Sequence, residues 1–275
     1  PKLVDAPGRI KGLAGLVELP RGRAPRHLAR IQRARQAEQA RQRGVMSKDR
    51  LARLCFAITF AIAGFSFCLQ FVQDWLGVWD DPGLAPPSHA VRAWQYFSYF
   101  TTQANLLVIA TSLSLARRPD RDGSGWRIAR LDALTGITIT GLVHWFLLHP
   151  LDHFRGWLWA SDTLVHIVVP TLVVLGWLVF GPRRRIGIRV VLLGLIWPIV
   201  WLVYTLVVGA VTGWYPYFFL DVRESGAGTV AVYCVAILIL LLAVSCLFWL
   251  GDRWLPGRRS DEAGSKRGRI QAQRP

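Results

Sequence analysis

Six long stretches without a charged residue dominate this 275-residue chain. They contain no Asp, Glu, Lys or Arg, and they cover residues 54–73, 93–116, 133–151, 163–181, 190–212 and 229–250. Each is about 19 residues or longer, the length that an α-helix needs to cross the roughly 30 Å hydrocarbon core of a bilayer. We therefore predict an all-α polytopic membrane protein, a bundle of six transmembrane helices with spans at about residues 51–73, 93–116, 133–151, 161–181, 188–212 and 229–250.

The basic residues are distributed unevenly among the segments outside these runs. Thirteen Lys and Arg residues lie within residues 1–50, and further basic clusters follow the second, fourth and sixth runs. The three remaining connections hold one Arg each and seven acidic residues in total. The positive-inside rule then places the N and C termini in the cytoplasm and the protein in the plasma membrane.

The net charge of +16 raises the alternative of nucleic-acid binding. Nucleic-acid binding requires basic residues that converge on one surface together with aromatic partners. Here the basic residues alternate between connections, so we expect no nucleic-acid partner. We expect membrane lipids as partners instead, with anionic headgroups at the basic connections.

The two ends of the chain differ in composition from its centre. We expect residues 1–50 and 251–275 to form basic, disordered cytoplasmic tails around a membrane domain at 51–250. Met46 is the only methionine, and two interpretations of residues 1–45 stay open: a tail on anionic lipid, or a segment upstream of the true start at Met46. The cysteines show no metal-binding spacing, so we expect small apolar core residues and no cofactor at Cys55, Cys68, Cys234 and Cys246.

Polar residues interrupt the second apolar run, in the segment "YFSYFTTQANLL". With a rise of 1.5 Å per residue, Thr101 should lie about 12 Å below the outer membrane surface, and His144 and His166 about 8–9 Å below it. Residues three or four apart share a helical face. Polar residues that share a face on each of four helices, all at a similar depth, predict a polar cavity open to the outer leaflet. The cavity should be formed by Ser98, Thr101, Asn105, Thr140, His144, Asp162, His166, Tyr204 and Thr205.

A purely structural interpretation of this cluster stays open. Thr and Ser in membrane helices often bond to their own helix carbonyl or to a neighbouring helix. An intramembrane His is costlier and indicates a functional site more strongly. Aromatic residues near the outer ends of the spans are expected to anchor the protein at the interface, namely Trp75, Trp79, Trp94, Trp157, Trp159, Trp214, Tyr215 and Tyr217.

Three segments, "YFSYFTTQANLL", "DTLVHIVVPTLVVLGWLVF" and "VYTLVVGAVTGWYPYFFLD", resemble those of an actinobacterial six-span membrane protein family of the Pr-six-Pr type. That family remotely resembles the androgen-induced membrane threonine hydrolases of animals, which cleave fatty-acid esters of hydroxy fatty acids. The resemblance covers about residues 50–250. It implies a catalytic Thr101 and His166, and the adjacent Thr102 leaves the alignment ambiguous by one residue.

The chemistry of such a site is coherent. A neutral His accepts the proton of a Thr hydroxyl and later returns it to the leaving alkoxide. We expect Asn105 to donate a hydrogen bond to the oxyanion and Asp162 to orient His166, with Gln103, His144 and Tyr204 as further supporting residues.

Three functions therefore remain open. The leading one is an intramembrane hydrolase of lipid esters that acts from the outer leaflet. The second is a non-catalytic carrier or assembly partner. The third is a haem-binding electron carrier that uses His144 and His166.

Overall fold

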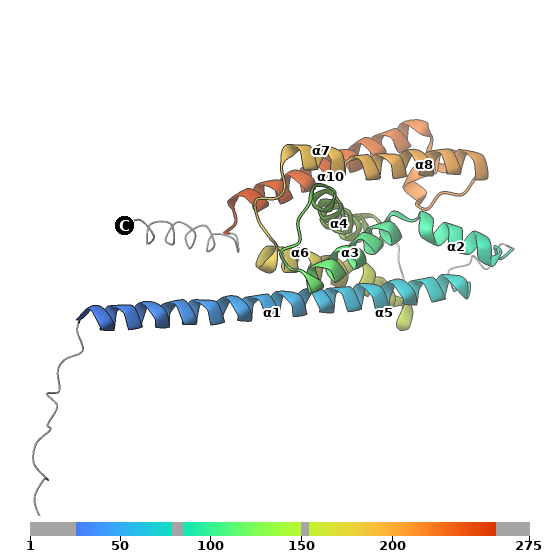
Figure 1. The fold of residues 1–275 in the computed structure, drawn as a ribbon. Helices are drawn as coiled ribbons and strands as arrows, with labels where there is room; N and C mark the ends of the chain where they lie inside the picture. The colour runs from blue at the N-terminus through green and yellow to red at the C-terminus, as the bar shows by residue number, and fades with distance from the viewer. Residues whose placement is uncertain (1–25, 79–84, 150–153, 257–275) are drawn as a thin grey trace, which may run out of the picture. The chain divides into compact units, whose positions relative to one another are not determined.

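The computed structural model describes residues 26–78, 85–149 and 154–256, and every regular element in these ranges is a helix (Figure 1). The helices are α1 (Arg26–Trp75), α2 (His89–Ser98), α3 (Phe100–Arg117), α4 (Ser124–Val143), η1 (His144–Leu148), α5 (Trp157–Thr163), η3 (Leu164–Val168), α6 (Val169–Phe180), α7 (Ile188–Gly194), α8 (Ile196–Thr212), η4 (Phe218–Leu220), α9 (Val222–Ser225) and α10 (Ala227–Trp254).

The chain divides into two compact units, residues 1–48 and 49–275. Within the first unit, the disorder expected over residues 1–50 is not what the structure shows from Arg26 onward, because α1 begins there. Its Ala-, Arg- and Gln-rich sequence has high helix propensity, which explains the helix. Residues 1–25 and 257–275 lie outside the described ranges, so the expected disorder of those parts stays a prediction.

Five helical segments among the described residues are long and apolar enough to cross a membrane. They are Lys48–Trp75, Ser124–Leu148, Trp157–Phe180, Ile188–Thr212 and Ala227–Trp254. The protein is thus a multi-pass membrane protein built from helices. The segment expected to form a further span, residues 93–116, is not one continuous helix, because α2 ends at Ser98 and α3 begins at Phe100.

Helix α4 is the central helix of the second unit. Its span is 56% buried inside the protein, whereas the other four spans are 22–33% buried. It packs against α3, α6, α7 and α10 (Figure 1). It begins well before the expected residue 133, because its two arginines have partners. Arg127 pairs with Asp122 at 2.7 Å, and the Arg130 guanidinium lies over the Phe56 ring.

The break between α2 and α3 at Tyr99 leaves backbone carbonyls without helical partners, which is costly where water is excluded. Side chains of the polar cluster satisfy them. Gln103 Nε2 donates to the Phe97 carbonyl at 3.1 Å, and Trp201 Nε1 donates to the Ser98 carbonyl at 2.8 Å. Much of the polar character of this segment is therefore explained by the break itself.

Two π-helical turns, η1 and η3, lie near the ends of two spans. In η1 the His149 N–H bonds to the His144 carbonyl, and in η3 the Val169 N–H bonds to the Leu164 carbonyl. Proline at position 170 has no N–H to give to the carbonyl four residues earlier, which favours a wider turn before it. Turns of this kind are frequent at functional sites.

The four cysteines are free. Cys55, Cys234 and Cys246 are half-buried, whereas Cys68 is exposed on the surface of α1. The expectation that all four are core residues is therefore wrong for Cys68, whose small apolar side chain is equally suited to the lipid-facing side of a span.

Candidate functional site

Two histidines flank one carboxylate at the ends of neighbouring spans. Asp162 in α5 places Oδ1 2.8 Å from His166 Nδ1 and Oδ2 3.2 Å from His144 Nε2. The two imidazole rings stack with centroids 4.1 Å apart and planes within 7° of parallel. His144 is 1% exposed and Asp162 7% exposed, so this His–Asp–His cluster is largely shielded from solvent.

The π-helical turns position both histidines of the His–Asp–His cluster. His144 is the first residue of η1, and His166 is the central residue of η3. Asp162 precedes η3 by two residues and lies four residues before His166, a spacing that puts both side chains on one helical face. The aspartate therefore orients one histidine from its own helix and contacts the other across the bundle.

A cavity of about 390 Å³ opens beside the His–Asp–His cluster. It brings together residues from α1, α2, α3, η1, α5, η3 and the segment before η4, and its lining consists of Gln70, Asp74, Tyr96, Tyr99, Thr101, Thr102, His144, Leu148, Phe154, Asp162, His166, Pro216, Tyr217 and Phe218. Both threonines of the ambiguous alignment therefore face the same cavity as the histidines.

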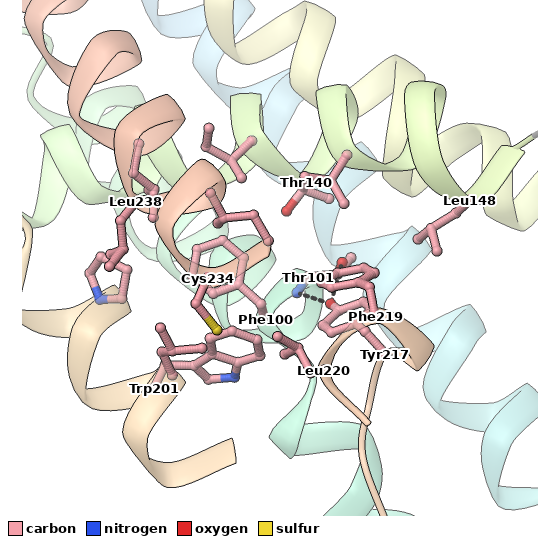
Figure 2. A pocket seen from close by; sticks show the side chains of 16 residues that line it. Phe100, Thr101, Thr140, Leu148, Trp201, Tyr217, Phe219, Leu220, Cys234 and Leu238 are labelled. Atoms are coloured by element: carbon pink, nitrogen blue, oxygen red, sulfur yellow. Dashed lines mark hydrogen bonds between the residues drawn. The ribbon is translucent and has the colours of Figure 1, made fainter. Parts of the chain in front are cut away.

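Thr101 meets a tyrosine from a distant part of the chain. The Tyr217 hydroxyl lies 3.2 Å from Thr101 Oγ1 and accepts a hydrogen bond from the Thr101 N–H at 3.3 Å (Figure 2). Burial raises the pKa of the Tyr217 hydroxyl, so the group stays protonated and available as a donor. Tyr217 was expected to anchor the protein at the membrane interface. Instead, the segment after Gly213 folds inward and brings the Tyr217 hydroxyl to Thr101.

The left-handed backbone at Gly213 allows this inward fold. Its φ of 79° ends α8 in a conformation that favours glycine. Arg223 then ties the segment down, because its guanidinium contacts both the Gly213 carbonyl and the Asp221 carboxylate. Sequence alone contains one signal for this arrangement, the glycine followed by Trp, Tyr and Pro.

A smaller apolar pocket adjoins the cavity. Its volume is about 50 Å³, and its lining is mainly aliphatic and aromatic (Figure 2). Thr101, Leu148 and Tyr217 line both this pocket and the larger cavity. The Thr101 hydroxyl therefore lies at the boundary between a polar space that contains the histidines and an apolar space between α3, α4, α8 and α10.

Three of the expected supporting residues have other partners. Asn105 Nδ2 donates to the Thr101 carbonyl at 2.9 Å, which ties the amide to its own helix. Gln103 bridges the Phe97 carbonyl and the Trp197 indole. Neither residue is part of the cavity lining.

Tyr204 is the third of these residues. Its hydroxyl bonds to Ser98 Oγ at 2.7 Å and accepts from Trp94 Nε1 at 3.0 Å, which joins α8 to α2. The side chain therefore supports the broken helix and lies outside the cavity lining.

The arrangement of the histidines differs from that of a haem site. Axial histidines lie on opposite sides of a haem plane, whereas His144 and His166 stack directly on each other. Their nitrogens also converge on one carboxylate. The haem alternative is therefore not supported.

Comparison of the chain with protein-family models, with curated proteins and with solved structures found no match. The resemblance seen in the three sequence segments stays a prediction.

Proposed function

We propose that the protein is a six-span membrane hydrolase of lipid esters, with both termini in the cytoplasm, Thr101 as nucleophile and His166 as general base. One observation supports it most. A threonine hydroxyl, a His–Asp pair and the N-terminus of a broken helix line a single cavity, next to an apolar pocket. These are the groups that acyl transfer from a lipid ester requires.

The Asp162–His166 contact defines the role of the base. An ionised carboxylate only accepts hydrogen bonds, so the proton of a neutral His166 lies on Nδ1, which faces Asp162 Oδ1 at 2.8 Å. The lone pair on Nε2 is then available for the Thr101 proton. Thr101 Oγ1 attacks the ester carbonyl, and His166 returns the proton to the leaving alkoxide. Water then hydrolyses the acyl-threonine by the same route.

Tyr217 and the start of α3 replace Asn105 as the proposed oxyanion donors. The Tyr217 hydroxyl is within 3.2 Å of the nucleophilic oxygen, and the Thr101 N–H belongs to the first turn of α3. The partial positive charge of a helix N-terminus stabilises an anion placed there. A fixed donor of this kind contributes about 10²–10³ in rate.

The position of the apolar pocket suggests the substrate class. An ester carbonyl at Thr101 places one end of the molecule beside the His–Asp–His cluster and the other beside Leu148 and its apolar neighbours. A polar ester group joined to an apolar chain matches these surroundings. We therefore propose an acyl ester that enters from the lipid phase.

A lipid-like fluorophosphonate probe tests the proposal on the detergent-purified protein. Wild type and Thr101→Ser should be labelled, because both carry a hydroxyl, whereas the isosteric Thr101→Val should not be. His166→Gln should slow labelling by about 10²–10⁴. Thr102→Val is the matched control for the neighbouring threonine and should be labelled at the wild-type rate.

The same variants test the structural alternative. If the hydrogen bond to Tyr217 is the whole contribution of the Thr101 hydroxyl, Thr101 has a packing role. In that case Thr101→Val would lower the melting temperature and wild type would show no labelling above background. That pair of results would favour a non-catalytic carrier or assembly partner.

A further inference from the structure

We propose that His144, Asp162 and His166 form a binding site for one divalent transition-metal ion, Zn²⁺, and that the bound ion inhibits the hydrolase. The metal site stands on its own geometry. Only the inhibitory role rests on the proposed function of Thr101 and His166.

The donor atoms are already close together. One ligand atom from each of the three residues lies within 4.8 Å of the others. Each histidine also contacts its own carboxylate oxygen of Asp162, with His166 Nδ1 2.8 Å from Oδ1 and His144 Nε2 3.2 Å from Oδ2. Ligand atoms around a tetrahedral zinc ion are roughly 3.4 Å apart, given bonds of about 2.1 Å. Binding therefore needs the stacked imidazole rings to turn toward a common centre, with little movement of the backbone.

A nitrogen of His144 supplies a second, independent observation. His144 is 1% exposed, and its Nε2 makes no hydrogen bond within the described residues, although it lies 3.2 Å from Asp162 Oδ2. The contact is close but lacks hydrogen-bond geometry. A buried imidazole nitrogen without such a partner is costly, and a metal ion bound between it and the carboxylate would use its lone pair.

The ligand set selects the class of metal. Imidazole favours zinc and its transition-metal neighbours, whereas magnesium and calcium prefer sites made of oxygen atoms. Three protein ligands leave a fourth tetrahedral position open. The cavity of about 390 Å³ adjoins that position, so water or another small ligand fits there.

Metal binding and general-base catalysis require different tautomers of His166. In the metal-free hydrolase, Nδ1 carries the proton and Nε2 is the base. An ion bound to Nδ1 takes that lone pair, so the proton of the neutral ring moves to Nε2. The nitrogen that should accept the Thr101 proton is then already protonated, and labelling or hydrolysis stops.

Metal binding is tested first, on the detergent-purified full chain with its affinity tag removed and after treatment with a chelator. One equivalent of Co²⁺ should give the visible absorption of a tetrahedral ion, Zn²⁺ should displace it, and Mg²⁺ should not. His144→Ala and Asp162→Asn should each lose the cobalt spectrum. His89→Ala, which removes a histidine of α2 stacked on Trp75, should retain it.

The inhibitory role is tested with the fluorophosphonate probe. Stoichiometric Zn²⁺ should reduce labelling of wild type at least tenfold, and chelator should restore it. Thr101→Val should bind Co²⁺ like wild type although it is not labelled, which separates the metal site from the nucleophile. A melting curve without metal checks that each ligand variant is folded.

Three outcomes decide the proposal. Absence of a cobalt spectrum in folded wild type overturns the metal site, even where labelling supports the hydrolase. A cobalt spectrum with labelling that zinc leaves unchanged overturns the inhibitory role alone. A cobalt spectrum in a protein that is never labelled keeps the metal site and refutes the hydrolase.

Discussion

Removing the Gln103 side chain tests whether the polar cluster stabilises the broken helix. Gln103 Nε2 donates to the Phe97 carbonyl at 3.1 Å, and its Oε1 accepts from Trp197 Nε1 at 3.0 Å. A hydrogen bond contributes about 0.5–1.5 kcal/mol, so Gln103→Met, which preserves most of the volume, should lower the free energy of unfolding by about 1–3 kcal/mol. Both partners are beside the break, where helical hydrogen bonds are missing.

A double-mutant cycle isolates one of these two bonds. Trp197→Phe removes the indole N–H, and it also alters the stacking on Phe100, whose ring centroid is 4.7 Å away. The cycle cancels that second effect, provided that each substitution leaves the other's packing unchanged. The coupling energy between Gln103→Met and Trp197→Phe should be about 0.5–1.5 kcal/mol.

Reversible unfolding in mixed detergent micelles, followed by circular dichroism, measures these free energies. A coupling energy of zero within experimental error would refute the Gln103–Trp197 bond as a source of stability. Loss of stability in Gln103→Met together with normal probe labelling of the folded fraction would confirm that Gln103 supports the fold without taking part in the reaction. Gln103 was expected to be a site residue, so this result would also fix its role.

Two further predictions concern the segment that positions Tyr217 and the orientation of the chain. A Cβ at position 209 would overlap the Tyr215 ring, so Gly209→Ala should displace the segment that holds Tyr217. This change should lower the free energy of unfolding by about 1–3 kcal/mol and slow probe labelling. Labelling at the wild-type rate would contradict this prediction. In a Cys-free background, Ala85→Cys should react with an impermeant thiol reagent added to intact cells and Ser124→Cys should not; the reverse pattern would overturn the proposed orientation.

The five membrane helices could be predicted from sequence because length and absence of charge are sufficient to identify them. The start of α4 could not be predicted in this way. Its first turns contain Arg127, Arg130 and Asp132, and charges normally argue against a span. The Phe56 ring under the Arg130 guanidinium is far away in sequence, and it makes that charge acceptable. Such pairing is a tertiary property that apolar runs do not reveal.

Part of the candidate site followed from helical spacing. The contact between Asp162 and His166 was expected from their separation by four residues, and the matched depth of His144 was expected from counting along its span. The π-helical turns were not predicted, because one extra residue in a turn leaves no compositional signal. Tyr217 was missed for a different reason: its position depends on how the segment after Gly213 folds.

The structure separates two roles within the polar cluster. The break between α2 and α3 leaves backbone carbonyls without helical partners, and side chains near the break supply donors to them. Gln103 donates to the Phe97 carbonyl at the end of α2, whereas Asn105 donates to the Thr101 carbonyl of its own helix. The Thr101 hydroxyl is not used in this way, because its partner is a tyrosine hydroxyl at the cavity.

Backbone stability does not explain the break between α2 and α3. A continuous helix would satisfy the same backbone groups without any polar side chain, so the break adds cost and no stability of its own. What it adds is a helix N-terminus at Phe100, beside the Thr101 hydroxyl and the cavity that the histidines line. Discontinuous membrane helices place such ends at sites for anionic groups. An oxyanion that forms at Thr101 is a group of that kind, and the proposed reaction would explain why the break is kept.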